Sequence, residues 1–298
     1  MKAEKVDLKK HMREQKEMVN IVLDRLIPRK NDYPKEIHKA MRHTLFAGGK
    51  RIRPHLTIMV YNLFSRERED LVWQAGGAIE VLHTYTLIHD DLPEIDNDDY
   101  RRGKKTCHVL FGADIALLAG DALLVEAFNM VNELNIKAEL KVRMIADMAE
   151  LAGDKGLIAG QMVDIQSEGK AVKRKTVDFI HLNKTAKLIQ LCCRFGAYLA
   201  KVPASHVKRL DEFGEKIGLA FQIIDDILDV ESSSEKMGKT VGKDQAENKA
   251  TYPSVYGMEQ SKKKADKLID DALKLLKPYG EHANMLKEFT LMLAKRES

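Results

Sequence analysis

The chain has 298 residues, 44% of them hydrophobic and 32% charged, which is a balance typical of globular proteins. Basic residues outnumber acidic residues by only 49 to 45, and this small excess argues against a nucleic-acid-binding protein. No apolar run is long enough for a membrane span, the N-terminus lacks the apolar core of a secretory signal, and the three cysteines lack zinc-ligand spacing, so we expect a cytoplasmic protein.

Helical periodicity dominates the sequence from end to end, and no run alternates apolar and polar residues over the length of a strand. The clearest predicted helices cover residues 71–92, 115–134, 207–230, 261–276 and 282–295. Pro54 fits the first turn of a further helix, after a basic run. Without a repeat or a linker to mark a boundary, we expect one all-α domain over 1–298, a bundle of roughly ten or more helices.

Two of these segments carry further expectations. Residues 115–134 are apolar on all sides, which predicts a buried central helix. The stretch 231–249 is rich in Ser and Lys and is the best candidate for a mobile loop.

The first acidic segment, residues 90–99, places six carboxylates in ten positions. Crowded carboxylates repel one another unless cations lie among them, and hard oxygen ligands suit magnesium, above all when substrate phosphates complete the octahedron. Pro93 disfavours helix at Leu92, so Asp90 and Asp91 are expected on the last helical turn. Carboxylates are unfavourable at that end of the helix dipole, which again indicates a bound cation.

The second acidic segment, residues 225–229, has a different geometry. Asp225 and Asp229 are four residues apart and share a helix face, and Asp226 is three residues from Asp229. These like charges interrupt an apolar run instead of forming a polar stripe. A solvated charged face remains the alternative for either acidic segment taken alone.

Basic residues accompany the acidic segments. Lys50 and Arg53 follow the double glycine Gly48-Gly49, and arginine offers a planar fork that suits phosphate oxygens. The glycine spacing excludes a Walker phosphate loop. A helix end followed by solvated charges is the alternative, but Arg101-Arg102, directly after the first acidic segment, favours a metal–phosphate site.

Taken together, these motifs resemble the trans-isoprenyl diphosphate synthases. The resemblance is carried by the spacing of the two aspartate clusters and by the segments 48–54, 87–93, 101–102 and 250–253. It covers about residues 35–256 and is greatest to the bacterial farnesyl diphosphate synthases, whose first cluster also has two extra residues before its third aspartate. The sequence departs from the family pattern at Ala186, Tyr100 and Lys243 without losing a ligand.

The resemblance implies an isoprenoid-synthase bundle around a central cavity, a homodimer, and Mg²⁺ as cofactor, with roughly three ions in each active site. Its two substrates would be isopentenyl diphosphate and an allylic diphosphate, joined to give farnesyl diphosphate. By position, the implied magnesium ligands are Asp90, Asp91, Asp96, Asp225, Asp226 and Asp229. The implied substrate-binding residues are Arg101, Lys184, Lys239 and Lys249 for the allylic diphosphate, Lys50, Arg53, His83 and Arg102 for isopentenyl diphosphate, and Thr185 and Gln222 at the reaction centre.

The chemistry of these residues fits that reaction. Magnesium ions and Lys or Arg donors stabilise the charge that develops on a departing diphosphate. Because no side chain in the motifs is an obvious general base, the resemblance implies that the released diphosphate accepts the proton. We expect Asp90, Asp91, Arg101, Lys184 and Asp225 to carry catalysis.

Product length depends on the residues below the first acidic segment. The resemblance implies that Tyr85 closes the floor of the hydrocarbon pocket, although helical geometry aligns Thr86 better with Asp90. The expected product is therefore C15, with a C20 geranylgeranyl diphosphate synthase as the alternative. A class I terpene cyclase, a non-catalytic prenyl-synthase subunit and a metal-stabilised helical scaffold are weaker alternatives.

Overall fold

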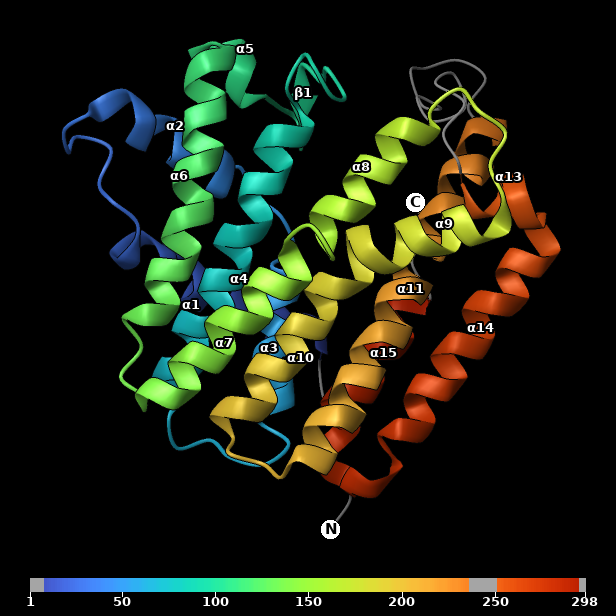
Figure 1. The fold of residues 1–298 in the computed structure, drawn as a ribbon. Coiled ribbons are helices and arrows are strands. Elements are labelled where there is room, and N and C mark those ends of the chain that lie inside the picture. The colour runs from blue at the N-terminus through green and yellow to red at the C-terminus, as the bar shows by residue number, and fades with distance from the viewer. Residues whose placement is uncertain (1–7, 236–250, 295–298) are drawn as a thin grey trace. The chain divides into compact units, whose positions relative to one another are not determined.

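The computed structural model describes residues 8–235 and 251–294, and these residues are almost entirely helical (Figure 1). The all-α prediction is confirmed, with more than ten helices in the described ranges. The helices form two compact units, each described here by itself. The N-terminal unit comprises residues 8–61 and 65–146, and the C-terminal unit comprises residues 62–64, 147–235 and 251–294. A single domain over 1–298 stays a prediction.

The N-terminal unit is built around helix α4, which packs against α6, α3 and α1. Pro54 lies in the first turn of α3, as predicted, and its Cα would lie 3.0 Å from a Cβ added at Gly76 of α4. A glycine therefore lets these two helices approach closely. The elements of this unit are α1 (Leu8–Leu26), α2 (Lys35–Leu45), α3 (Ile52–Tyr61), α4 (Glu69–Asp90), α5 (Cys107–Phe111), α6 (Ala113–Asn132) and the first part of α7 (Ala138–Ala152).

A small hairpin follows α4, where no strand is expected from the sequence. Strands β1 (Tyr100–Arg101) and β2 (Lys104–Lys105) pair antiparallel across a two-residue turn. Arg102 and Gly103 both have positive φ, 55° and 74°, which is the requirement of the tight turn that matches strand twist. An arginine in the left-handed region is an uncommon turn residue, so the sequence pattern does not reveal this hairpin.

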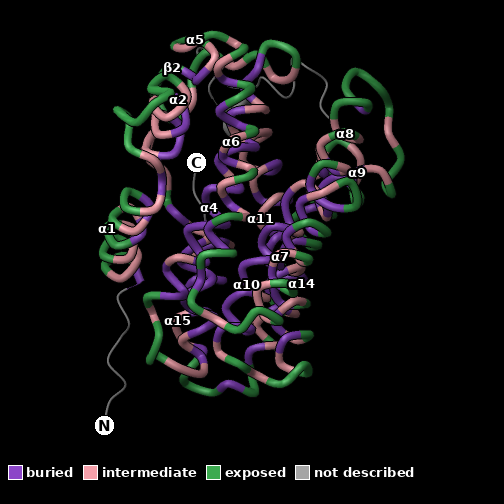
Figure 2. The backbone as a smooth tube through the Cα atoms, turned by 60° about the vertical axis from the view of Figure 1, so that its left-hand side comes forward, coloured by how far each residue is buried: buried purple, intermediate pink, exposed green. Residues whose placement is uncertain are grey.

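Helix α6 corrects the expectation of a helix buried on all sides. One face is buried through Ala116, Leu123 and Ala127, but Leu118 and Val125 on the other face are 56% and 68% exposed. Figure 2 shows buried and exposed stretches along this helix. Apolar composition alone could not show that only one side of the helix meets a partner within the chain.

The C-terminal unit is organised by α11, which packs against α10 and α14. Ile223 and Ile227 of α11 lie in an apolar cluster with Leu268 and Ile269 of α14, which explains the apolar run around the second acidic segment. The elements are α8 (Leu157–Ser167), α9 (Arg174–Ile180), the π-helix η1 (His181–Ala186), α10 (Lys187–Leu199), α11 (Ala204–Glu235), α13 (Tyr252–Tyr256), α14 (Met258–Leu275), the 3₁₀-helix η2 (Lys277–Ala283) and α15 (Asn284–Ala294).

A loop is expected at 231–249, but its first five residues are helical, because α11 continues through Glu235. The remainder of that stretch, with Lys243, lies outside the described residues. The three cysteines are buried and free. Among the helices that the structure describes, none combines the length and apolarity needed to cross a bilayer.

Candidate active site

The first acidic segment lies at the C-terminal end of α4, as predicted from Pro93. The helix ends at Asp90, and Asp91 is its C-cap. The chain then folds back, because the backbone N–H of Asp96 donates to the carbonyl of Asp90 at 2.9 Å and that of Asn97 donates to Leu92 at 3.0 Å. Asn97 allows this turn with φ 48°. The turn returns Asp96 to the helix end despite the four residues between it and Asp91.

Asp91 is held by the arginine that follows the acidic segment. Its carboxylate is almost fully buried and accepts hydrogen bonds from Arg101 Nε at 2.7 and 2.9 Å, and Arg101 Nη2 lies 2.6 Å from Asp91 Oδ1. Burial raises the pKa of Asp91, and the hydrogen bond and charge of Arg101 oppose that rise. Arg101 Nη2 also lies 3.9 Å from Asp98 Oδ2. Arg101 thus neutralises part of the acidic segment.

The basic segment after α2 is a strained loop held by a buried ion pair. Gly48 and Gly49 have φ of 110° and 116°, and Arg51 has φ 51°. Arg51 Nη1 donates to Glu80 Oε1 on α4 at 2.9 Å, and Arg51 Nη2 donates to the carbonyl of Leu45 at 2.6 Å. The side chains of this ion pair are 2% and 4% exposed. Arg51 therefore stabilises the loop from inside, and Lys50, its neighbour, is exposed.

Two of the predicted isopentenyl diphosphate residues, Arg53 and Arg102, lie close enough to a third, His83, to affect its pKa. Burial lowers the pKa of His83 well below its usual value, and the charges of Arg53, Arg102, Arg101 and Arg51 lower it further. Arg102 reaches the basic loop, where its Nη1 donates to the carbonyl of Gly48 at 2.5 Å. Burial and three neighbouring arginines lower the pKa of Arg102, whereas the charge of Glu80 raises it. Cations that are held close together repel one another, so an anion that binds among them lowers the electrostatic energy.

Tyr85 and Thr86 are both buried on α4 below the acidic segment. Burial and the charge of Asp90 raise the pKa of Tyr85 to about 12, and its hydroxyl has no hydrogen-bond partner among the described residues. The ring of Tyr85 contacts His89 edge-on, with 5.6 Å between centroids. Thr86 instead folds its hydroxyl back to the carbonyl of His83 at 2.8 Å.

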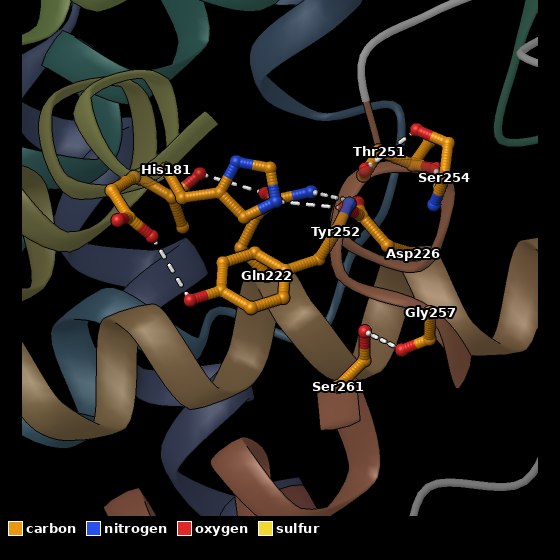
Figure 3. Close-up of polar contacts among 10 residues, drawn as sticks. His181, Gln222, Asp226, Thr251, Tyr252, Ser254, Gly257 and Ser261 are labelled. Atoms are coloured by element: carbon orange, nitrogen blue, oxygen red, sulfur yellow. Dashed lines mark hydrogen bonds and ion pairs between the residues drawn. The ribbon is translucent and has the colours of Figure 1, made fainter. Parts of the chain in front are cut away.

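The second acidic segment lies within α11, and Asp226 is its most buried carboxylate. Asp226 Oδ2 accepts hydrogen bonds from His181 Nε2 and from the backbone N–H of Tyr252, both at 2.7 Å, and Oδ1 accepts from Gln222 Nε2 at 3.1 Å (Figure 3). Asp225 and Asp229 are only half-buried. The two neighbouring aspartates, Asp225 and Asp226, thus have different surroundings.

The π-helix η1 carries Lys184 and Thr185, two of the predicted substrate-binding residues. Thr185 Oγ1 donates to Gln222 Oε1 at 2.7 Å, so the two predicted reaction-centre residues are hydrogen-bonded to each other. Lys184 Nζ forms an ion pair with Asp164 Oδ2 of α8 at 2.6 Å. Single π-turns inside helices occur often at functional sites.

The cofactor prediction rests on the chemistry of the donors. No group of three His, Cys, Asp or Glu side chains with metal-binding geometry occurs in residues 8–235 and 251–294. Magnesium keeps several waters and takes one or two carboxylates plus substrate phosphates, so the carboxylates of the two acidic segments fit it as donors. Lys239 and Lys249, which are predicted to bind the allylic diphosphate, lie outside the described residues.

Three residues of these surroundings are not identified by the sequence analysis: Glu80, Asp164 and His181. Tyr252 lies in the motif 250–253, but no role is assigned to it from the sequence. Glu80 carries a usable signal, because it is a lone charge in the apolar run 78–82. His181 precedes Lys184 by three residues and carries no signal of its own. Its role is visible only once α11 and η1 are placed side by side.

Comparison with known proteins identifies relatives along almost the whole chain. The profile of the polyprenyl synthetase family matches residues 34–289. A farnesyl diphosphate synthase of Geobacillus stearothermophilus is 43% identical over 87% of this chain and 88% of its own length. A geranylgeranyl diphosphate synthase of Cyanophora paradoxa is 44% identical over 88% of this chain and 87% of its own. The crystal structure of an FPP/GFPP synthase from Zymomonas mobilis superimposes with a TM-score of 0.87, at 32% identity, over 96% of this chain and 99% of that one.

Replacing Glu80 tests the role of the buried ion pair. Glu80→Ala should lower the free energy of unfolding by about 3–5 kcal/mol, because it leaves the Arg51 guanidinium buried without a counter-charge. Urea unfolding monitored by circular dichroism measures this loss. The matched control is Glu36→Ala, which removes an exposed ion pair with Lys39 and should cost less than about 1 kcal/mol. Equal stability of the two variants would contradict the assigned role.

Proposed function

This chain belongs to the polyprenyl synthetase family, and we propose that it is a trans-prenyltransferase that condenses an allylic diphosphate with isopentenyl diphosphate to give farnesyl diphosphate. The observation that carries the proposal is the family match over residues 34–289, which contains both acidic segments and the basic loop with every motif in order. We place it in the cytoplasm as a further part of the proposal.

Each diphosphate has its own proposed binding residues. For isopentenyl diphosphate, the cations around His83 supply the positive field, and Lys50 is exposed beside them. Arg102 donates to the basic loop and so ties the two arginine-bearing segments together. For the allylic diphosphate, we assign Arg101 and Lys184, with Lys239 and Lys249 as further ligands. Arg101 and Lys184 are both prepaired with aspartates, which orients them before substrate binds.

The proposed cofactor is Mg²⁺, held by Asp90, Asp91 and Asp96 in the N-terminal unit and by Asp225 and Asp229 in the C-terminal unit. When bound, magnesium supplies charge neutralisation to the leaving diphosphate. Arg101 and Lys184 would each serve as a donor to the diphosphate group as charge develops on it. That the two acidic segments bind one substrate stays part of the proposal.

After the diphosphate departs, the allylic cation must meet the isopentenyl double bond before it meets water. Thr185 and Gln222, already hydrogen-bonded to each other, would line the place where the cation forms. The partial negative charge on their oxygen atoms would stabilise the transient cation. The released diphosphate would accept the proton.

A C20 product is the second candidate, because a geranylgeranyl diphosphate synthase is among the relatives that cover nearly the whole chain. The C15 product is favoured by Tyr85, a large buried side chain on the helix that ends at Asp90. Its ring volume would stop a growing hydrocarbon. The retained aspartates and arginines argue against a non-catalytic subunit.

A homodimer completes the proposal. In the N-terminal unit, α6 presents Leu117, Leu118 and Val125 to solvent, and α5 adds the exposed Val109 and Leu110. Grouped apolar residues on one exposed surface mark an interaction site more often than scattered ones do. A second copy of this chain would cover them.

The activity itself is tested by product analysis. Incubating the purified protein with dimethylallyl diphosphate, isopentenyl diphosphate and MgCl₂ should give farnesyl diphosphate, identified by chromatography of the dephosphorylated lipid. Asp90→Ala and Asp225→Ala should each lower turnover by about a hundredfold or more with helix content intact, because each removes charge stabilisation from the leaving group. Asp154→Ala, an exposed turn carboxylate, is the control and should remain active. Near-normal turnover of either acidic-segment variant would contradict the assignment.

Product length is tested at Tyr85. Tyr85→Ala should shift the main product from C15 to C20 or longer, because it removes the ring that closes the pocket. The same chromatographic assay measures the shift. Tyr279→Ala, another buried tyrosine, lies in the C-terminal unit against Phe64 and His206 and should leave the product unchanged. If Tyr85→Ala still makes the C15 product, another residue forms the floor of the hydrocarbon pocket.

Charged substitutions on the exposed apolar side of α6 test the proposed dimer surface. Leu118→Glu combined with Val125→Glu should convert a dimer to a monomer, since burying two carboxylates without partners costs several kcal/mol. Light scattering coupled to size-exclusion chromatography gives the mass. Met18→Glu, on the exposed side of α1, should leave the dimer intact. A double variant that stays dimeric would place the interface elsewhere.

A further inference from the structure

The carboxylate of Asp226 is a meeting point of three segments of the C-terminal unit. It is 7% exposed and receives one hydrogen bond from η1 through His181, one from α11 through Gln222 and one from the backbone of Tyr252 at the start of α13 (Figure 3). We call these four residues the Asp226 hub. These three hydrogen bonds come from donors within the protein and satisfy much of the acceptor capacity of a carboxylate.

The hub determines which way the Gln222 amide points. Its Nε2 donates to Asp226 and its Oε1 accepts from Thr185. Turning the amide over would bring Oε1 against the Asp226 carboxylate, which is electrostatically unfavourable. Asp226 therefore fixes the orientation of Gln222, and Gln222 in turn fixes the Thr185 hydroxyl.

His181 is the hub residue that joins η1 to α11. It is 4% exposed, and its Nε2 lies 2.7 Å from Asp226 Oδ2, so Nε2 is the donor. The backbones of the two helices also approach closely, since a Cβ at Gly218 would lie 2.6 Å from Ala186 Cα. This close packing and the His181 hydrogen bond together set the register of Thr185 against Gln222.

The other end of the hub is anchored by a second carboxylate. Asp178 of α9 accepts hydrogen bonds from the hydroxyls of Tyr252 at 2.9 Å and Tyr256 at 2.8 Å, and these two rings stack with centroids 4.4 Å apart. Burial and the bond to Asp178 raise the pKa of Tyr252, so its hydroxyl stays a donor. Helix α13 is thereby tied to α9 by side chains and to α11 by its first backbone N–H.

We propose that His181 is a positioning residue of the prenyl transfer, acting through Asp226 on Gln222 and Thr185, and that Asp226 serves this hub instead of binding magnesium. The inference rests on the proposed function for its substrates. It changes the role predicted for Asp226 from its spacing, and it gives a role to His181, which the motifs leave unassigned.

Kinetics separate this role from a merely structural one. His181→Phe keeps the ring volume but removes the donor, and it should lower kcat about tenfold to a hundredfold, the effect of losing one hydrogen bond to a charged group. The KM for isopentenyl diphosphate should change by less than about threefold, because its proposed ligands lie outside the hub. His181→Gln, which keeps an N–H near the position of Nε2, should recover most of the lost kcat. A matched control is His206→Phe, which removes the hydrogen bond between His206 Nδ1 and the Tyr279 hydroxyl, outside the hub, and should leave kcat unchanged.

Metal binding gives a readout that does not depend on turnover. Mn²⁺ titrated in the presence of inorganic diphosphate and followed by electron paramagnetic resonance should bind His181→Phe and Asp226→Asn within about threefold of wild type, whereas Asp225→Asn should bind about tenfold or more weakly. Asp226→Asn should lower kcat as His181→Phe does. Weakened Mn²⁺ binding by Asp226→Asn, equal to that of Asp225→Asn, would make Asp226 a ligand and overturn the proposal.

The remaining outcomes are also decisive. A wild-type protein that makes no prenyl product overturns the proposed function, and the Mn²⁺ titration still decides the role of Asp226. An active wild type with His181→Phe at half or more of its kcat overturns the positioning role. If circular dichroism shows that His181→Phe does not fold, His181→Gln and Asp226→Asn decide the question. A high kcat of His181→Gln with a low kcat of Asp226→Asn supports the hub. A high kcat of both variants overturns it.

Discussion

Repulsion between like charges is the constraint that shapes both units of this protein. In the N-terminal unit, four arginines lie close enough to depress the pKa of one histidine, and such a group stays together only if something inside the fold compensates it. Glu80 does so from the buried side of α4, paired with Arg51. The cost of burying this pair is offset by the hydrogen bonds that satisfy Arg51 on Leu45 and Asn20. Arg101 is in turn paired with Asp91, and Arg102 donates to the carbonyl of Gly48.

In the C-terminal unit, the buried negative charge of Asp226 is stabilised by neutral hydrogen-bond donors. Asp226 receives an imidazole N–H, an amide N–H and a backbone N–H, which spread its charge over three segments. Two adjacent aspartates on one helix thus become chemically different. Asp226 is almost fully buried, and Asp225 is half-buried. An identical side chain at the next position meets other surroundings because the helix turns it by about 100°.

The sequence predicts the positions of the helices and of the charged segments well, since both depend on local rules. Pro93 locates the end of α4 to within a few residues, and the spacing of the acids identifies the second segment. Prediction from the sequence fails where a property depends on which residues pack against an element in the fold. The exposed side of α6 and the histidine of the hub are both set by neighbours distant in sequence. The hairpin at Arg102 is missed for a local reason, because arginine seldom adopts positive φ.

In the proposed function, helix α4 would join charge chemistry and product length in a single element. Its C-terminal end carries Asp90, and Tyr85 lies about 7.5 Å lower along the axis by helical rise. The Tyr85 hydroxyl is buried with no partner among the described residues, a condition that costs about 1–3 kcal/mol. A phenylalanine would fill almost the same space without that cost, so apolar packing does not explain the hydroxyl. What the hydroxyl adds is reach, because it lengthens the ring by one oxygen atom. That reach would suit the proposed role of Tyr85, which is to limit the depth of the hydrocarbon pocket.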